Sequence, residues 1–150
     1  MKVCIPTSVS GHLTEILYLM ETFEGCDIFF VTTDNSRTRD LSSRYRTYFF
    51  PVEVETKPIA LLKSVPHMIR IIRLEHPQVM FSTGAQFTIL FLYLGKFFGA
   101  KIIFLEDLTR VHTPTWTGRL VYPISDLFLV QHPSLLEKYG KKAEYEGGIL

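Results

Sequence analysis

Short runs of apolar and β-branched residues alternate along the chain with longer stretches in which apolar side chains recur at helical spacing. The runs predict β-strands, and the stretches between them predict helices. Several runs are apolar throughout, which is typical of strands covered on both faces. The expected strands are residues 2–7, 27–33, 47–52, 79–82, 101–105 and 127–131, and the expected helices are residues 12–23, 38–44, 59–75, 86–98, 116–122 and 134–139.

This alternation predicts an α/β fold, a doubly wound, mostly parallel, Rossmann-like sheet with helices on both faces. A chain of 150 residues is long enough for one such domain. No repeat, low-complexity segment or long linker divides the sequence, so residues 1–150 are expected to form a single domain. Ligands of these sheets bind outside the carboxyl ends of the strands, which selects the loops to inspect.

Loops that follow predicted strands should meet at that edge. The loop after the first strand contains Ser8, Ser10 and Gly11, the loop after the fourth contains Thr83 and Gly84, and residues 106–115 follow the fifth. Small residues where a strand turns into a helix let backbone N–H groups and the positive helix end approach a phosphate. A phosphate or diphosphate is therefore the expected ligand. The alternative is a pair of tight turns, with Ser10 capping its helix and Gly84 only relieving crowding.

Composition narrows the classes of ligand. The formal net charge is only +1, whereas a nucleic-acid binder usually has a strongly basic surface, so no nucleic-acid partner is expected. Cys4 and Cys26 fall on predicted buried strands without C-x-x-C spacing. No cluster of His, Cys or Asp has the spacing of metal ligands. We therefore expect no metal and no cofactor, and the cysteines suit a reducing cytosol.

The apolar stretches bear on membrane attachment. The longest, residues 87–98, is interrupted by polar residues and is shorter than the roughly 20 residues that span a bilayer, so no transmembrane helix is expected. Residues 59–74 mix apolar and basic side chains, as in a helix that lies at an anionic membrane surface, and Pro66 could kink or split this helix. We expect a cytoplasmic protein that is attached peripherally to a membrane.

Several motifs, most of them in the second half, resemble a known family. They are Ser82-Thr83-Gly84-Ala85, Gly99 to Glu106, Arg110-Val111, Thr117 to Ile124, Asp126 to Gln131 and Gly147-Gly148, with Ser10-Gly11-His12 near the N-terminus. In these residues the chain resembles the PssD/CpsF family of bacterial polysaccharide-biosynthesis proteins. That family is related to the membrane-associated subunit of the eukaryotic two-subunit transferase that adds the second GlcNAc to dolichol-diphosphate-GlcNAc. Many members have a glycine where Ser10 stands here.

The resemblance implies the N-terminal half of a MurG-like GT-B glycosyltransferase, acting in polysaccharide or lipid-linked oligosaccharide biosynthesis. Such a half holds a lipid-diphosphate-linked sugar acceptor at the cytoplasmic face of the inner membrane. A separate, PssE-like subunit would bind the UDP-sugar donor, and transfer of a hexose or of N-acetylglucosamine would need both chains. The loops with Ser8, Ser10, Gly11, Thr83 and Gly84 would then hold the acceptor diphosphate.

Sugar transfer needs a base for the acceptor hydroxyl, and two side chains are catalytic candidates. His12 is expected to contact the acceptor or to act as the base, because a helix N-terminus favours the neutral imidazole. Glu106 resembles an acceptor-contacting glutamate of MurG-like enzymes. Arg110 could pair with that carboxylate or bind the acceptor phosphate. The alternatives are backbone hydrogen bonding by His12, loop capping by Glu106 and a solvated Arg110.

Two other functions are open at this point. The chain could be a non-catalytic membrane scaffold that recruits or stabilises a transferase subunit. It could also be a free-standing nucleotide-binding protein, although the three-glycine fingerprint is missing and only Asp34 stands near the end of the second strand as a ribose ligand. Asp126 is expected to cap a strand or to form a salt bridge rather than to catalyse.

Overall fold

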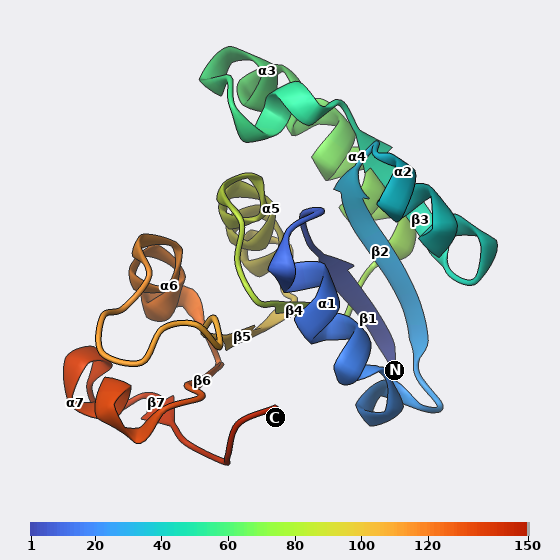
Figure 1. Cartoon of the computed structure of the whole chain (residues 1–150). Coiled ribbons are helices and arrows are strands. Elements are labelled where there is room, and N and C mark those ends of the chain that lie inside the picture. Colours follow the sequence, from blue (N-terminus) through green and yellow to red (C-terminus); the bar gives the residue numbers. More distant parts are fainter. Residues whose placement is uncertain (150) are drawn as a thin grey trace.

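Seven parallel strands form one sheet in the computed structural model, which describes residues 1–149 (Figure 1). The strands are β1 (Lys2–Pro6), β2 (Asp27–Thr33), β3 (Arg46–Phe50), β4 (Val79–Ser82), β5 (Lys101–Leu105), β6 (Leu127–Leu129) and β7 (Ala143–Glu144). Their order across the sheet is β3-β2-β1-β4-β5-β6-β7. The predicted α/β class and the six predicted strands are confirmed. The two-residue β7 was not predicted, because it lies in a polar sequence without an apolar run.

Helices connect the strands at the predicted places. They are α1 (Gly11–Tyr18), α2 (Ser36–Arg39), α3 (Pro58–Lys63), α4 (Val65–Glu75), α5 (Gln86–Phe97), α6 (Trp116–Val121) and α7 (Leu136–Tyr139). Short 3₁₀ turns cover Met20–Phe23, Asp40–Ser43, Val52–Glu55, Tyr122–Ile124 and Pro133–Leu135. The helix predicted for residues 12–23 is therefore shorter, because its second half is a 3₁₀ turn.

The long helix predicted for residues 59–75 consists of two helices, α3 and α4, which meet at Ser64. Pro66 lies in the first turn of α4, where its missing N–H and its fixed φ are tolerated. The split at the proline thus follows from local chemistry. The other end of α4 is set by His76, whose φ of 47° is left-handed, and by Pro77 after it.

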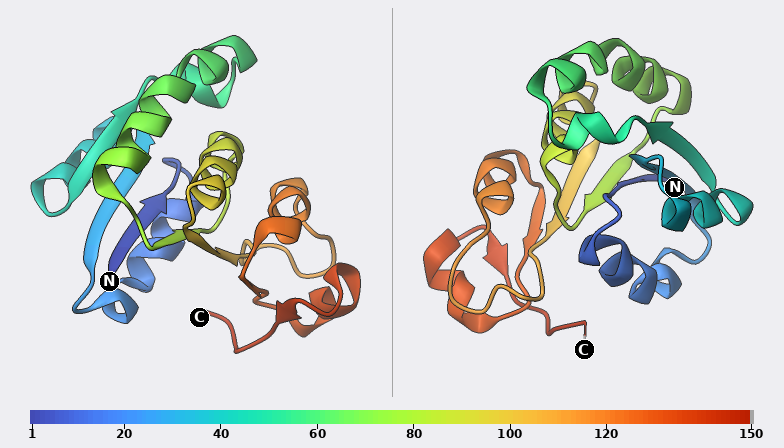
Figure 2. Two further views of the ribbon diagram at one scale, coloured as in Figure 1. Left: turned by 180° about the vertical axis from the view of Figure 1, so that it is seen from behind. Right: turned by 45° about the horizontal axis from the view of Figure 1, so that its top comes forward.

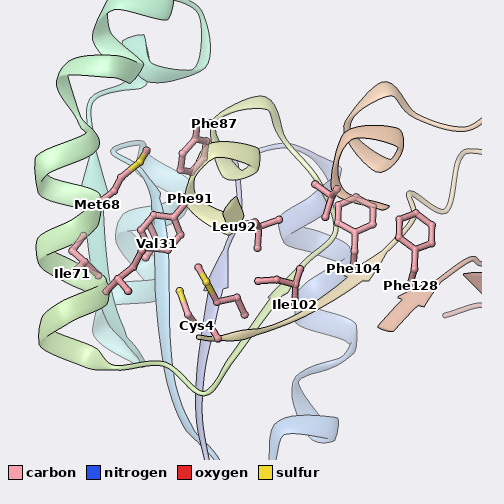
Figure 3. Close-up of a cluster of buried hydrophobic side chains, with 14 of the residues drawn as sticks. Cys4, Val31, Met68, Ile71, Phe87, Phe91, Leu92, Ile102, Phe104 and Phe128 are labelled. Atoms are coloured by element: carbon pink, nitrogen blue, oxygen red, sulfur yellow. The ribbon is translucent and has the colours of Figure 1, made fainter. Parts of the chain in front are cut away.

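The core consists of two apolar clusters, one on each face of the sheet. The larger cluster joins the sheet to α4 and α5, and its centre contains Met68, Ile71, Phe87 and Phe91 (Figure 3). The smaller cluster packs α1 against the opposite face (Figure 2). Helices on both faces explain why the central strands are apolar at nearly every position.

The direction in which the chain winds reverses between β1 and β4. From β1 the chain passes through α1 to β2, whereas α3 and α4 lead back to β4 on the other side of β1. The carboxyl ends of the two strands are tied together, because the Ser82 hydroxyl donates a hydrogen bond to the Pro6 carbonyl (3.1 Å). This switch point places the loops after β1 and β4 side by side, as parallel sheets of this kind require.

Candidate functional site

The loop after β1 leaves the first turn of α1 open. Ser8 is buried and its hydroxyl hydrogen-bonds that of Ser10 at 2.8 Å. Ser10 and Gly11 are exposed, and a Cβ built on Gly11 would meet nothing within 4 Å. Ser10 holds the N-cap position, but its side chain makes no capping hydrogen bond. The small residues therefore leave space above the helix start, which is the feature that anion binding needs.

The loop after β4 lies directly against His12. Gly84 has a φ of +125°, and a Cβ at this position would lie 3.2 Å from His12 Cε1. The Thr83 hydroxyl also donates to the His12 carbonyl at 3.4 Å. Gly84 thus meets two requirements, a left-handed backbone and close approach of a ring. Thr83 and Gly84 are buried and form the floor of the site, while the more exposed groups come from the β1 loop.

His12 is half-buried at the second position of α1. Burial lowers the pKa of its imidazole, and the charge of Asp107 opposes this shift. This direction agrees with the expected neutral form, but the lowered pKa results from burial rather than from the helix end. Nδ1 of His12 is buried and has no hydrogen-bond partner among residues 1–149.

A third loop reaches the same place from β5. The Thr117 hydroxyl would lie 3.4 Å from a Cβ on Gly84. Thr117 also donates to the Thr115 hydroxyl at 3.2 Å, and Thr115 caps α6 through the Gly118 N–H. The predicted convergence of the loops after the first, fourth and fifth strands is present in the structure. Thr117 was not among the predicted site residues, although it stands in one of the family motifs.

Glu106 at the end of β5 is fully buried and engaged by the protein itself. Its carboxylate accepts hydrogen bonds from the Thr115 N–H (3.0 Å) and hydroxyl (2.6 Å), from the Asp107 N–H (3.0 Å) and from the Tyr139 hydroxyl. Burial raises the pKa of Glu106, and the bonds from Thr115 and Asp107 oppose that rise. This geometry is the loop-holding arrangement given above as the alternative. A catalytic role for Glu106 stays a prediction.

Gly118 makes the Glu106 arrangement possible, and sequence reasoning did not identify it. A Cβ at this position would lie 2.7 Å from Glu106 Oε2 and 2.8 Å from Thr115 Oγ1, and closer still to the Tyr139 hydroxyl. Its presence in the motif beginning at Thr117 was the available signal. The reason for a glycine there becomes visible only once α7 has folded against the loop.

Arg110 is exposed and forms no ion pair within residues 1–149. It follows a turn in which Asp107 accepts hydrogen bonds from the Thr109 N–H (2.8 Å) and hydroxyl (2.7 Å). Its guanidinium does not pair with Glu106 and stays available to an anion. Asp126 lies at the opposite end of the sheet, where it pairs with Lys96 at 2.7 Å, so its predicted salt bridge is confirmed.

Glu15 is a buried acid beside the site that sequence reasoning missed. It follows His12 by one helical turn, and its Oε1 accepts the Leu108 N–H at 2.9 Å. Its Oε2 is buried without a hydrogen-bond partner in the described part of the chain. Burial raises the pKa of Glu15 to about 7, the Leu108 bond opposes the rise, and the charges of Asp107 and Glu106 add to it. A charged residue on the inward face of α1 was the only signal in the sequence.

Within residues 59–74, the exposed large apolar side chains are Ile59 and Leu62 of α3 and Leu74 of α4, so they do not form a continuous stripe along the segment. Met68 and Ile72 of α4 are buried in the core, so these residues of the segment do not form a membrane-facing surface. Ile59, Leu62 and Trp116 are 69%, 65% and 63% exposed. Two adjoining hollows of about 560 and 250 Å³ share Thr56, Lys57 and Pro58, and they are also lined by Ile59, Lys63 and Trp116. We call Ile59, Leu62 and Trp116, with Lys57 and Lys63, the α3 patch.

The described residues form neither a metal-binding cluster nor a membrane-spanning helix. Among residues 1–149 no group of three or more His, Cys, Asp or Glu side chains is placed to hold a metal ion. Within the same range, every helix is too short or too polar to cross a bilayer.

The sequence has recognisable relatives. Residues 36–150 match the family described as "Oligosaccharide biosynthesis protein Alg14 like". The UDP-N-acetylglucosamine transferase subunit of Schizosaccharomyces pombe is 41% identical over 76 residues, which are 47% of this chain and 36% of that protein. The Yarrowia lipolytica subunit is 28% identical over 153 residues, covering 97% of this chain and 66% of that protein. The chain thus spans less than two thirds of these relatives.

Solved structures resemble the fold. MurG of Acinetobacter baumannii superimposes with a TM-score of 0.80 over 98% of this chain and 46% of that protein, at 12% identity. UDP-GlcNAc 2-epimerase of Methanocaldococcus jannaschii gives a TM-score of 0.74 over 99% of this chain and 46% of that protein, at 15% identity. At such identities the likeness establishes the fold alone, that of half a GT-B protein. The narrower resemblance to PssD/CpsF proteins stays a prediction.

Proposed function

This chain belongs to the Alg14-like family of oligosaccharide biosynthesis proteins, and on that premise we propose that it is the acceptor-binding subunit of a two-component glycosyltransferase. The names of its relatives, subunits of UDP-N-acetylglucosamine transferases, support UDP-GlcNAc as the donor and a second polypeptide as partner. The partner would be a PssE-like subunit that binds the nucleotide sugar. The acceptor would be a lipid-diphosphate-linked sugar.

The observation that carries this proposal is the meeting of three loops at the carboxyl edge of the sheet. The open first turn of α1, with Ser10 and Gly11, offers backbone N–H groups to a diphosphate. Arg110 is free to neutralise part of the ligand's negative charge. Nucleotide binding by this chain alone is less favoured, because the carboxylate of Asp34 is paired with Arg39 at 2.7 Å instead of being free for a ribose.

Within this site His12 acts as the acceptor contact or base. Burial favours its neutral form, which can take a proton from the acceptor hydroxyl. Glu106 holds the loop after β5 in place, because its oxygens are occupied by Thr115, Asp107 and Tyr139. Gly84 lies against the His12 ring, and the Thr83 hydroxyl donates to the His12 carbonyl.

The α3 patch would bring the site to its lipid-linked acceptor. Its apolar side chains, flanked by Lys57 and Lys63, suit the boundary between head groups and acyl chains of an anionic membrane. In Figure 1, α3 stands beyond the carboxyl ends of the central strands, the same edge as the proposed diphosphate site. The chain would then act as a peripheral protein on the cytoplasmic face of the inner membrane.

The acceptor site is tested by two matched glycine substitutions. Gly84→Ala and Gly99→Ala both place an alanine at a left-handed φ, +125° and +93°, but only Gly84 has His12 beside it. With the partner subunit, UDP-GlcNAc and a synthetic lipid diphosphate bearing GlcNAc, Gly84→Ala should raise the acceptor KM at least about tenfold, since small misplacements are costly. The donor KM should not change, and Gly99→Ala should leave both constants as they are.

Three outcomes would count against the proposal. Full transfer by this chain without a partner would remove the need for two components. Equal effects of Gly84→Ala and Gly99→Ala on the acceptor KM would show that the β4 loop is not part of the acceptor site. Unchanged transfer by a His12→Ala complex would favour a non-catalytic scaffold that only recruits the transferase subunit.

Membrane attachment is tested with vesicles that contain anionic lipids. Leu62→Glu should weaken binding at least about tenfold, because an apolar side chain loses its burial and a negative charge meets the anionic surface. Leu74→Glu is the matched control, since Leu74 is as exposed as Leu62, at 66%, but lies at the far end of α4. Equal vesicle binding by the two variants would show that the α3 patch does not attach the protein to the membrane.

A further inference from the structure

The buried carboxyl of Glu15 lies next to the proposed acceptor site without a role in it. Glu15 follows His12 by three residues on α1, and side chains at that spacing share one face, with Cβ atoms roughly 5–6 Å apart. Oε2 of Glu15 and Nδ1 of His12 are both buried without a hydrogen-bond partner among residues 1–149, so these two atoms do not bond to each other in this structure. Two such atoms on one helix face call for an explanation, because native proteins rarely leave buried polar atoms unused.

The other polar atoms of these two side chains are already placed. Oε1 of Glu15 accepts the Leu108 N–H at 2.9 Å, which holds the carboxyl between α1 and the loop after β5. On the His12 ring, Cε1 and Nε2 lie 3.2 and 3.6 Å from the position of a Cβ on Gly84. Nε2 is therefore at the β4 loop, where the acceptor is proposed to lie. Nδ1 is left for a partner within the protein.

The charges around the pair come from the loop after β5. Asp107 acts on both His12 and Glu15, and Glu106 acts on Glu15. The His132 ring hydrogen-bonds the Leu108 carbonyl at 2.7 Å and so fixes the residue whose N–H meets Glu15. Burial raises the pKa of Glu15 to about 7 and lowers that of His12, which removes the usual gap between a glutamate and a histidine.

We propose that Glu15 is a positioning residue: its carboxyl, held at Oε1 by the Leu108 N–H, turns Oε2 onto Nδ1 of His12 and shares a proton with it, so that Nε2 faces the acceptor hydroxyl. This inference rests on the proposed function. As the hydroxyl oxygen bonds to C1 of the donor sugar, its proton passes to Nε2. The bond from C1 to UDP breaks, and its electron pair leaves on the diphosphate. The Glu15 carboxylate stabilises the imidazolium until the proton returns to water.

Glu15→Gln isolates this role, because the amide oxygen can still accept the Leu108 N–H while the charge and the titratable proton are lost. The measurement is nitrogen NMR of the full chain labelled at histidine, followed across pH. In the wild type, neutral His12 should carry its proton on Nδ1, held by the carboxylate. In Glu15→Gln the tautomers should mix and the pKa of His12 should fall further. Glu21→Gln, on the exposed turn after α1, should leave His12 unchanged.

An identical tautomer and titration of His12 in Glu15→Gln would overturn the pairing, whatever the activity. If that variant fails to fold, the wild type still decides. Two coupled groups titrate in two steps, so a single-step His12 curve would overturn the pairing and a two-step curve would support it.

Steady-state kinetics distinguish a failure of the Glu15–His12 pairing from a failure of the proposed function. In the complex with its partner, Glu15→Gln should lower kcat at least about tenfold with little change in the acceptor KM, and it should shift the pH profile of kcat. A lower kcat with an unchanged pH profile would make Glu15 a merely structural clamp and would overturn the inference. Two-step titration of His12 in a wild-type complex that transfers no sugar would instead overturn the proposed function and leave the pairing supported.

Discussion

Buried carboxylates at the two edges of the sheet have different partners, and their pKa values are shifted in opposite directions. At the amino edge, Glu75 is 6% exposed and meets Lys2 at 3.1 Å and Arg46 at 2.7 Å, together with the Tyr48 hydroxyl. Burial would raise the pKa of Glu75, but the hydrogen bonds from Tyr48, Lys2 and Arg46 outweigh it and leave the pKa lowered. The charge of Glu75 is balanced by Lys2 and Arg46, so this arrangement stabilises the fold.

At the carboxyl edge, Glu15 and Glu106 are also buried, at 9% and 0% exposed, but they accept hydrogen bonds only from N–H and O–H groups. The pKa of each is raised by burial, and neighbouring Asp107 adds to the rise. Holding acids in this way costs stability at neutral pH. This difference between the edges supports the proposal that the carboxyl edge is the functional one, because perturbed acids are concentrated at functional sites of proteins.

The largest expected effect comes from removing Glu106. Glu106→Ala leaves buried donors of Thr115, Asp107 and Tyr139 without an acceptor, and we expect a loss of about 3 kcal/mol or more in the free energy of unfolding. Urea denaturation measures this loss. Glu137→Ala, at an exposed site on α7, should stay within about 0.5 kcal/mol of the wild type. A fully stable but inactive Glu106→Ala would restore the catalytic role predicted from the sequence.

Glu75→Gln removes the ion pairs at the amino edge. We expect it to lower the free energy of unfolding by about 2 kcal/mol at pH 7. The value lies below that of a fully buried pair, because Lys2 and Arg46 are 30% and 43% exposed. A lowered pKa means that the stabilisation is complete above about pH 4.5 and disappears as pH falls further. Unfolding experiments at pH 3 and pH 7 therefore suffice. A constant difference between the two pH values would contradict the ion pairing.

At the carboxyl edge, the free energy of unfolding should change with pH in the opposite direction. Because the folded pKa of Glu15 is raised from 4.5 to about 7, wild-type stability is complete below pH 4.5 and falls as pH rises through 7. Between pH 5 and pH 8 the wild type should lose roughly 2 to 3 kcal/mol relative to Glu15→Gln. Parallel stability curves for the two proteins would mean that Glu15 is not held as a perturbed acid.

The smallest effect concerns backbone strain at the site. Ala85, after Gly84, has a φ of 105° and a ψ of 144°, a region that glycine occupies with little cost. Ala85→Gly should raise the free energy of unfolding by about 0.5 kcal/mol, after the entropy cost of a glycine is subtracted. Ala60→Gly within α3 should lower it by about as much. A loss in both variants would show that Ala85 is not strained.

Much of the fold could be predicted because its causes are local. The apolar runs of β1, β2, β4 and β5 give their strands directly, and the proline in the segment 59–75 marks the break between α3 and α4. The length of the first helix was harder to predict. Its second half is a 3₁₀ turn, which has no distinct periodicity in the sequence. The short β7 depends on pairing with β6 at Phe128 and Leu129, and pairing is not a property of its own sequence.

The candidate site divides in the same way. The order of residues was enough to predict which loops meet, because parallel strands end at one edge, and it identified His12 and Gly84, which lie side by side. The enclosure of Glu106 by Thr115 and Tyr139 and the burial of Glu15 beside His12 could be seen only in the folded chain. Burial and hydrogen-bond partners set the behaviour of an acid, and segments distant in the sequence supply both.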